Sequence, residues 1–118
     1  MLTIVLIDDD PISTFVTEKL ILKNVKEPCE FYKYQSAKIA LNEIDSIRPN
    51  YLFLDLNMPV MNGWDFLNQY LKEFKLRKDR IIVLSSSIDF QDRQKAKEYS
   101  CVEGFIEKPL SPEKIKNI

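Results

Sequence analysis

A chain of 118 residues, 45% hydrophobic and 30% charged, is long enough for one domain with one core and too short for two. Its formal net charge of −1, without a basic block, argues against a protein that binds nucleic acid by electrostatics. No stretch approaches the roughly 18 apolar residues of a membrane span, and the chain has no histidine, which excludes Ser/His and Cys/His catalysis.

The first half of the chain alternates between strand-like and helix-like patterns. Residues 3–7 are a continuous apolar run of strand length, and residues 30–34 mix polar and apolar side chains, as a partly exposed strand does. Asp10 is the expected N-cap of the first helix, with Pro11 as its first residue. The apolar residues that mark this helix are Ile12, Phe15, Val16 and Leu20. A second helix opens at Ser36 and is marked by Ala37, Ala40, Leu41, Ile44 and Ile47.

The second half continues the alternation. Residues 51–54 and 81–84 are again continuous apolar runs, and residues 104–107 form a mixed run. A third helix is marked by Leu67, Tyr70, Leu71 and Phe74. A fourth helix is predicted from about Phe90 to Tyr99, and the last begins near Ser111 and is either short or continued beyond residue 118.

This alternation predicts a single α/β domain over residues 1–118, with a doubly wound parallel sheet of five strands. The three continuous apolar runs should be the central strands, because helices cover such strands on both faces. Residues 30–34 and 104–107 should be the edges. Ligands of such sheets bind beyond the carboxyl ends of the strands, where the winding reverses.

Charged residues follow three of the predicted strands at that rim. Asp8, Asp9 and Asp10 follow the first strand, Asp55 opens the segment Asp-Leu-Asn-Met-Pro-Val-Met-Asn-Gly after the third, and Lys108 follows the fifth. Carboxylates gathered in a partly buried pocket repel one another unless a cation lies among them. Oxygen ligands with room for water suit Mg²⁺, and the spacing of an EF-hand calcium site is absent.

These motifs resemble the receiver domain of bacterial two-component response regulators, over essentially the whole chain. The resemblance rests on the acidic pair after the first strand, Asp-x-x-Met-Pro-x-Met-Asn-Gly after the third, Ser85 ending the fourth and Lys-Pro after the fifth. It implies a flavodoxin-like (βα)5 fold with strand order 2-1-3-4-5. It also implies that Asp55 accepts a phosphoryl group from a phosphohistidine. Asp9 and Asp55 would bind Mg²⁺ directly, Asp8 through water, and Asn57 through its backbone carbonyl.

The resemblance assigns further roles near the fifth strand. Lys108 would neutralise charge on the phosphoryl oxygens. The family has a cis peptide bond after this lysine, which would aim the ammonium inward, and the sequence leaves the isomer of Lys108–Pro109 open. Ser85 would move to bond the phosphoryl group, and Phe105 would rotate inward in response. The domain would then present an altered surface at the fourth helix and fifth strand.

The resemblance also implies partners. A histidine kinase or a histidine phosphotransfer protein would dock near the first helix, with Ile12 and Phe15 as contacts, and a downstream protein or output domain would read the altered surface. We expect no direct binding of nucleic acid and no membrane association, and a cytoplasmic location. Slow hydrolysis of its own phosphate would time the signal, so we do not expect an enzyme in the usual sense.

Other readings of the same residues remain open at this stage. A haloacid-dehalogenase-type phosphatase would use Asp8, Asp10, Ser85 and Lys108, but Glu113 is the sole acid after the lysine where that family needs an acidic pair. A flavin carrier with this fold would have its phosphate repelled by three aspartates. A protein-interaction module with an inactive site is the third reading. Gly63 is expected to supply backbone freedom before the third helix.

Overall fold

The computed structural model describes residues 1–58, 61–73, 80–86, 90–108 and 110–116. Strands and helices alternate along it as predicted. In chain order they are β1 Leu2–Ile7, α1 Pro11–Asn24, β2 Cys29–Tyr34, α2 Ala37–Ile47, β3 Tyr51–Asp55, α3 Gly63–Glu73, β4 Arg80–Ser85, α4 Phe90–Lys97, β5 Val102–Glu107 and α5 Pro112–Lys116.

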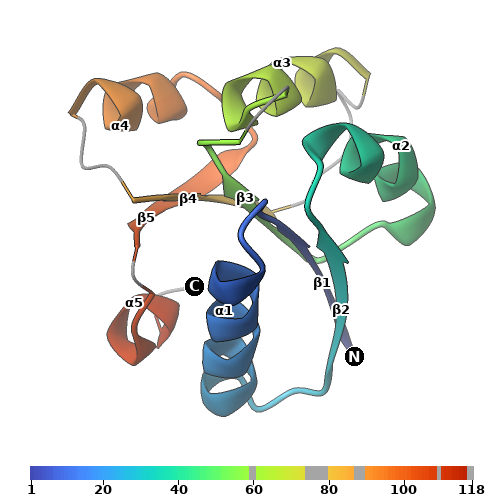
Figure 1. Ribbon diagram of the computed structural model, residues 1–118, viewed down its shortest axis with the longest axis vertical. Helices are drawn as coiled ribbons and strands as arrows, with labels where there is room; N and C mark the ends of the chain where they lie inside the picture. The colour runs from blue at the N-terminus through green and yellow to red at the C-terminus, as the bar shows by residue number, and fades with distance from the viewer. Residues whose placement is uncertain (59–60, 74–79, 87–89, 109, 117–118) are drawn as a thin grey trace.

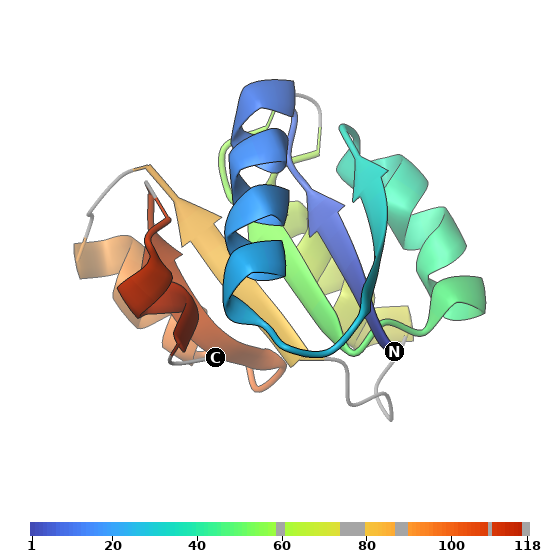
Figure 2. The same cartoon turned by 90° about the horizontal axis from the view of Figure 1, so that it is seen from below.

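The described strands form one parallel sheet in the order β2-β1-β3-β4-β5 (Figure 1). Helices α1 and α5 lie on one face of the sheet and α2, α3 and α4 on the other, as the two views show (Figure 2). The predicted flavodoxin-like fold, its strand order and its two edge strands are confirmed. Because all strands run the same way, their carboxyl ends meet at one rim.

The core is divided by the sheet into two apolar layers. Successive side chains of a strand point to opposite faces, so Val5 and Ile7 join the layer with α2 and α3 while Ile4 and Leu6 join the layer with α1 and α5. All four side chains are buried. Burial on both faces explains why the central strands read as continuous apolar runs, and it holds the ends of β1 and β3 in fixed positions.

The face of α1 that packs on the sheet differs from the predicted one. Thr14, Thr17 and Ile21 are buried, whereas Ile12 and Phe15 are 73% and 59% exposed. The Thr14 hydroxyl donates to the backbone carbonyl of Asp10 at 3.2 Å, so this polar group is satisfied although its residue is buried. The Asp10 cap lies directly after β1 and starts the helix there. Ile12, Phe15 and Val16 are exposed, whereas Leu20 packs against the core layer as predicted.

Several boundaries also differ from prediction. β2 begins one residue earlier and β5 two residues earlier, where the register against β4 shifts between Ile81 and Ile82. α4 ends at Lys97 instead of Tyr99, because the amides of Glu98 and Tyr99 bond three residues back in a tighter turn. Within the described residues, no helix is long and apolar enough to cross a membrane. The predicted helical position Phe74 lies outside the described residues.

Candidate functional site

Three predicted site residues from three separate strands converge at the carboxyl rim of the sheet. Asp8 follows β1, Asp55 is the last residue of β3, and Lys108 follows β5. The Lys108 Nζ lies 2.8 Å from Asp8 Oδ2 and 3.5 Å from Asp55 Oδ2. The structure therefore places one ammonium group between two carboxylates that the sequence separates widely.

The backbone of the neighbouring strands fixes this lysine and the segment that begins at Asp55. The Lys108 amide donates to the Ser85 carbonyl at 2.7 Å, and the Leu56 amide donates to the Leu84 carbonyl at 3.2 Å. Ser85 is fully buried at the end of β4, between β3 and β5. These bonds extend the sheet ladder by one residue on each side and hold the rim rigid.

Asp8 is held in place from the start of α1. Its Oδ1 accepts the Asp10 amide at 2.9 Å, and the Asp10 side chain accepts the Ile12 amide at 3.0 Å as the N-cap of the helix. The predicted capping role of Asp10 is confirmed. Asp8 is 3% exposed, whereas Asp9 between them is exposed. Of these three consecutive residues, Asp8 is buried in the rim, Asp9 is exposed to solvent, and Asp10 caps the helix.

The chain after Asp55 turns back on itself within a short distance. The Asn57 amide donates to Asp55 Oδ1 at 3.2 Å, and the Gly63 amide donates to the Leu56 carbonyl at 3.0 Å. A Cβ on Gly63 would lie 2.7 Å from Leu56 Cα and 2.8 Å from the Asp55 carbonyl oxygen. Gly63 has no positive φ, so the prediction that it supplies backbone freedom is wrong. Its role is to let α3 approach the segment that carries Asp55.

The acidic side chains at the rim suit a hard divalent cation. Asp8, Asp9 and Asp55 each offer a carboxylate oxygen, and these oxygens lie within 4.8 Å of one another. A set of carboxylate oxygens, one of them on an exposed residue that leaves room for water, is the kind of site that Mg²⁺ or Mn²⁺ prefers. The donor set therefore fits the predicted metal ion.

Electrostatics distinguishes the two buried acids. Burial raises the pKa of the Asp55 carboxyl to about 6, although the Lys108 ammonium acts against this and the Asp8 carboxylate adds to it. Burial acts on Asp8 in the same direction, yet its pKa is lowered overall by hydrogen bonds from Lys108, the Asp10 amide and the Ser13 hydroxyl. The ionised form of Asp8 is thus stabilised by its pairing with Lys108, whereas the surroundings of Asp55 disfavour its negative charge. No signal in the sequence singled out Ser13.

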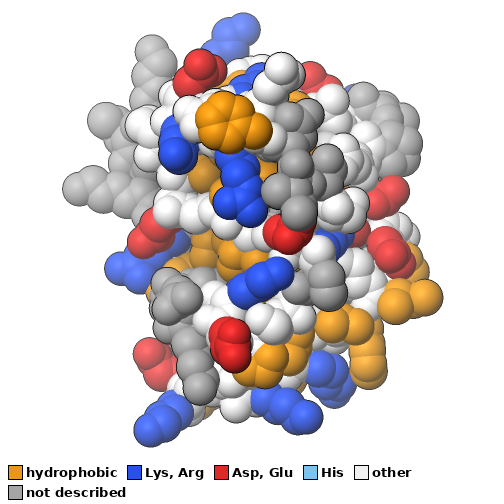
Figure 3. All heavy atoms as spheres, turned by 90° about the vertical axis from the view of Figure 1, so that its left-hand side faces the viewer, with side chains coloured by type: hydrophobic (Ala, Val, Ile, Leu, Met, Phe, Trp, Pro, Cys, Tyr) orange, Lys and Arg blue, Asp and Glu red, His pale blue; other side chains and the backbone are white. Residues whose placement is uncertain are grey.

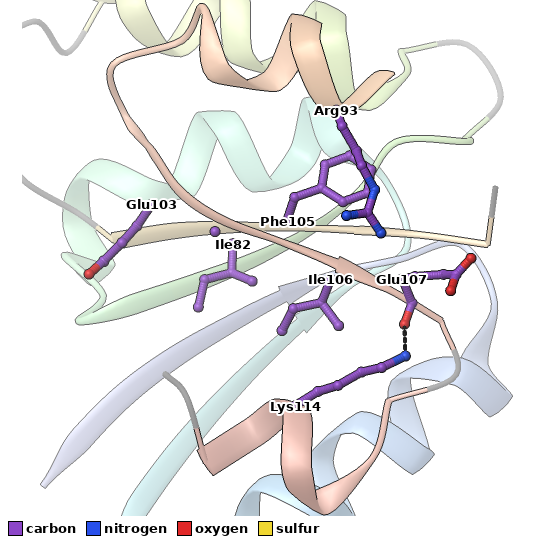
Figure 4. A pocket seen from close by; sticks show the side chains of 8 residues that line it. Ile82, Arg93, Glu103, Phe105, Ile106, Glu107 and Lys114 are labelled. Carbon is purple, nitrogen blue, oxygen red and sulfur yellow. Dashed lines mark hydrogen bonds between the residues drawn. The ribbon is translucent and has the colours of Figure 1, made fainter. Parts of the chain in front are cut away.

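The two predicted switch residues lie on neighbouring strands. Ser85 is buried, and Phe105 is half-buried on β5, where it packs against the core layer that contains α2 and α3. The Arg93 guanidinium of α4 lies over the Phe105 ring, 5.3 Å from its centroid (Figure 4). Sequence reasoning missed Arg93, since only the fold brings it to β5. The isomer of the Lys108–Pro109 bond cannot be assigned, because Pro109 lies outside the described residues.

Trp64, in the first turn of α3, also contacts the α4 region. Its ring stacks on Tyr99 with the centroids 5.8 Å apart, and the Lys95 ammonium lies 4.7 Å from its centroid. The Tyr99 hydroxyl donates to Asn68 of α3 at 2.8 Å. The end of α4 and the residues after it therefore contact α3 through aromatic stacking, a cation–π contact and a hydrogen bond.

Taken together, fold and site define a doubly wound α/β domain with an acidic rim that could hold a divalent cation and a buried carboxylate that faces a lysine. A protein-family model, TP_0454_N, described as an N-terminal domain, matches residues 2–101. A two-component response regulator from Cytophaga hutchinsonii superposes with a TM-score of 0.89 at 29% identity, covering 98% of this chain and 91% of that one. The chain belongs to the TP_0454_N family and is a receiver domain of the response-regulator type.

Two further relatives extend the comparison. The Mn²⁺-bound form of response regulator Rcp1 shares the fold with a TM-score of 0.80 at 20% identity, covering 99% of this chain and 88% of that one. A hybrid signal transduction histidine kinase C from Dictyostelium discoideum is 25% identical over 115 residues, which are 93% of this chain. The chain spans 9% of the length of that kinase. Receiver domains thus occur both as response regulators and within a longer kinase among these relatives.

Proposed function

We propose that this receiver domain accepts a phosphoryl group on Asp55 from the phosphohistidine of a histidine kinase or a phosphotransfer protein, and that the modified domain signals through an altered surface. One observation carries the proposal. Asp55 ends the middle strand of a receiver fold with its Oδ2 3.5 Å from the Lys108 ammonium, among the carboxylates of a cation site. Receiver-type relatives support the two-component role.

The transfer would form a P–O bond to a carboxylate oxygen of Asp55 while the P–N bond of the donor histidine breaks and its imidazole leaves. The reacting oxygen must be ionised. A pKa of about 6 keeps most Asp55 carboxyls ionised near pH 7.5, and their charge is poorly solvated and therefore reactive. Lys108 lies where it can bond the phosphoryl oxygens, whose charge spreads as the group transfers.

A divalent cation, which we propose to be Mg²⁺, would be held by Asp8, Asp9 and Asp55, with the backbone carbonyl of Asn57 as a further ligand. Bound there, it supplies positive charge that offsets the carboxylates and the incoming phosphoryl group. The chain's own contribution is to orient two of these carboxylates, Asp8 through the Asp10 amide and Asp55 through the Asn57 amide.

The proposed output passes through the residues beside β4. Ser85 ends β4, the strand between those that carry Asp55 and Lys108, and this position supports the proposal that its hydroxyl bonds a phosphoryl group on Asp55. Its movement would leave room for Phe105 to turn inward and would change the α4–β5 surface. A few kcal/mol between two such states suffices for a switch.

The upstream partner would dock beside the rim on α1. Ile12 and Phe15 are 73% and 59% exposed and lie within two turns of Asp8, so they offer apolar contacts next to the acceptor. Single exposed apolar residues are common on surfaces, but these two are exposed on a helix that buries Thr14 and Thr17 instead. A location in the cytoplasm, where a kinase would meet the domain, is part of this proposal, and slow self-hydrolysis would limit the lifetime of the signal.

Intact mass measured after incubation with acetyl phosphate and Mg²⁺ tests the acceptor. The wild type should gain the mass of one phosphoryl group, Asp55→Asn should gain none, and Asp45→Asn, an exposed acid on α2, should behave as the wild type. Mass gain by Asp55→Asn would place the acceptor elsewhere. The phosphatase reading predicts Asp8 as acceptor and Asp10 as acid catalyst. It is disfavoured because the Asp10 carboxylate is engaged as a helix cap.

A further inference from the structure

Helix α4 is weakly anchored, and its contacts are unusual for a helix that covers a sheet. Ala96 is its buried residue, and most of its other side chains are polar. Two cations of α4 lie over aromatic rings of neighbouring elements: Arg93 over Phe105 of β5 at 5.3 Å, and Lys95 over Trp64 of α3 at 4.7 Å. Two of the contacts that hold α4 in place are therefore cation–π contacts, each of which contributes little free energy.

The Arg93–Phe105 contact differs from the other because of the residue it holds. Phe105 is the proposed switch aromatic, and its ring points toward α4 with the guanidinium against it (Figure 4). Both residues line two adjoining cavities of about 360 and 420 Å³ on the side of the molecule that carries α4, β5 and α5. Figure 3 looks onto this side, where apolar surface is visible between Lys and Arg side chains. The pair forms part of the wall that the two cavities share.

We infer that Arg93 is a latch that holds the half-buried Phe105 ring in its present orientation against α4 (Figure 4) and so stabilises the resting form of the domain. This inference rests on the proposed function, because the orientation of the Phe105 ring matters only if the ring turns further inward on phosphorylation. A guanidinium over a ring is attracted by the negative face of the ring, and an inward turn of Phe105 loses that attraction. Arg93 would thus act by positioning Phe105, and it is not one of the residues that contact Asp55 or that we propose to bind the cation.

The latch has a measurable consequence in the affinity for a phosphoryl group. The apparent dissociation constant of any ligand that needs the inward form is its intrinsic value divided by the populated fraction of that form. An exposed cation–π contact changes that fraction by about 2-fold to 5-fold. Arg93→Ala should therefore bind a phosphoryl mimic more tightly by that factor, an effect opposite to the usual loss after removal of a contact.

The test uses the whole 118-residue chain with Mg²⁺ and beryllium fluoride as the phosphoryl mimic, followed by ¹⁹F NMR. Arg93→Ala should lower the apparent dissociation constant by about 2-fold to 5-fold. Arg93→Lys should fall between Arg93→Ala and the wild type, because it keeps a cation. Lys95→Ala is the matched control, since it removes the cation on the other ring, and it should leave the dissociation constant unchanged. In a Phe105→Leu background, Arg93→Ala should have no further effect.

Each other result overturns the latch. Unchanged or weaker binding by Arg93→Ala would show that the contact does not favour the resting form. Equal tightening in Lys95→Ala would assign the effect to the charge of α4, and tightening that persists without the Phe105 ring would assign it to another partner. If the wild type binds beryllium fluoride and Arg93→Ala does not differ from it, only the latch fails. If the wild type does not bind it, the proposed function fails and the latch with it.

Discussion

Asp55→Asn should stabilise this domain at alkaline pH in the absence of a divalent cation, although it removes a hydrogen-bonded, buried side chain. Asn has the shape of Asp, and its Oδ1 can still accept the Asn57 amide. It carries no charge to be desolvated or to repel Asp8. Because the native environment raises the pKa of Asp55 from 3.8 to about 6, ionising this group costs more in the folded than in the unfolded protein.

The sign and the pH window follow from this pKa. A carboxyl whose folded pKa is raised binds its proton more tightly in the folded state, so its contribution to stability is full below about pH 4 and is lost as the pH rises through about 6. The difference corresponds to about 3 kcal/mol at pH 8. Because this figure already includes the attraction of Asp55 to Lys108, we expect Asp55→Asn to gain about 1–3 kcal/mol at pH 8 and close to nothing at pH 4.

Urea unfolding at pH 8 and at pH 4, with a chelator present, measures this difference as a shift of the midpoint at constant slope. A gain of this size should move the midpoint at pH 8 by about 1 M. Asp45→Asn on the exposed face of α2 is the matched control and should show no such pH dependence. Equal midpoints of wild type and Asp55→Asn at pH 8, or a difference that is the same at both pH values, would refute the reasoning from charge burial.

Three further outcomes test other parts of the site. At Mg²⁺ concentrations above the dissociation constant, the unfolding temperature of the wild type should rise with the logarithm of the Mg²⁺ concentration. Asp8→Asn should weaken this rise, and an equal rise in both proteins would show that Asp8 does not bind the cation. Gly63→Ala should lower the free energy of unfolding in urea by about 1–3 kcal/mol, because the added Cβ would lie 2.7 Å from backbone. Gly104→Ala is the control and should lower it by about 0.5 kcal/mol or less, because its nearest neighbour would lie at 3.9 Å. Similar losses in both variants would contradict the role of Gly63 in the close approach of α3. Lys108→Met leaves the buried Asp8 carboxylate without its ammonium partner and should destabilise the domain by about 2–4 kcal/mol at pH 8. The loss should be smaller at low pH, where the carboxylate left unpaired in the variant takes up a proton; a loss independent of pH would point to lost packing instead.

The sequence predicts the sheet and the position of the site because both follow from local apolar patterns and from the rule that parallel strands end at the same edge of a sheet. Continuous apolar runs predict buried parallel strands, and parallel strands end at the same rim, so Asp8, Asp55 and Lys108 had to be near one another. The cap at Asp10 was likewise predictable, since capping depends on residues a few positions apart.

What the sequence did not reveal depends on how one element sits against another. Most of the apolar residues that mark α1 suggested the wrong buried face, because Thr14 and Thr17, which count as polar in a sequence pattern, occupy part of the face that is buried. The role of Gly63 lies in its distance from Leu56, which no local pattern records. Arg93 gains its meaning only from a ring on a different element.

The charges at the rim connect the proposed chemistry to the proposed switch. In the structure the Lys108 ammonium is closer to Asp8 than to Asp55, at 2.8 Å against 3.5 Å. The lysine therefore pairs mainly with Asp8, and the negative charge of Asp55, the proposed acceptor, is less fully neutralised. A cation and a phosphoryl group would each relieve that imbalance, and the free energy released would be available to move Ser85 and Phe105. The contact that opposes the movement, an exposed guanidinium on a ring, is weak by comparison. A resting state held by a weak latch and an active state driven by relief of buried charge would give a domain that switches fully when phosphorylated, yet returns when the phosphate is lost.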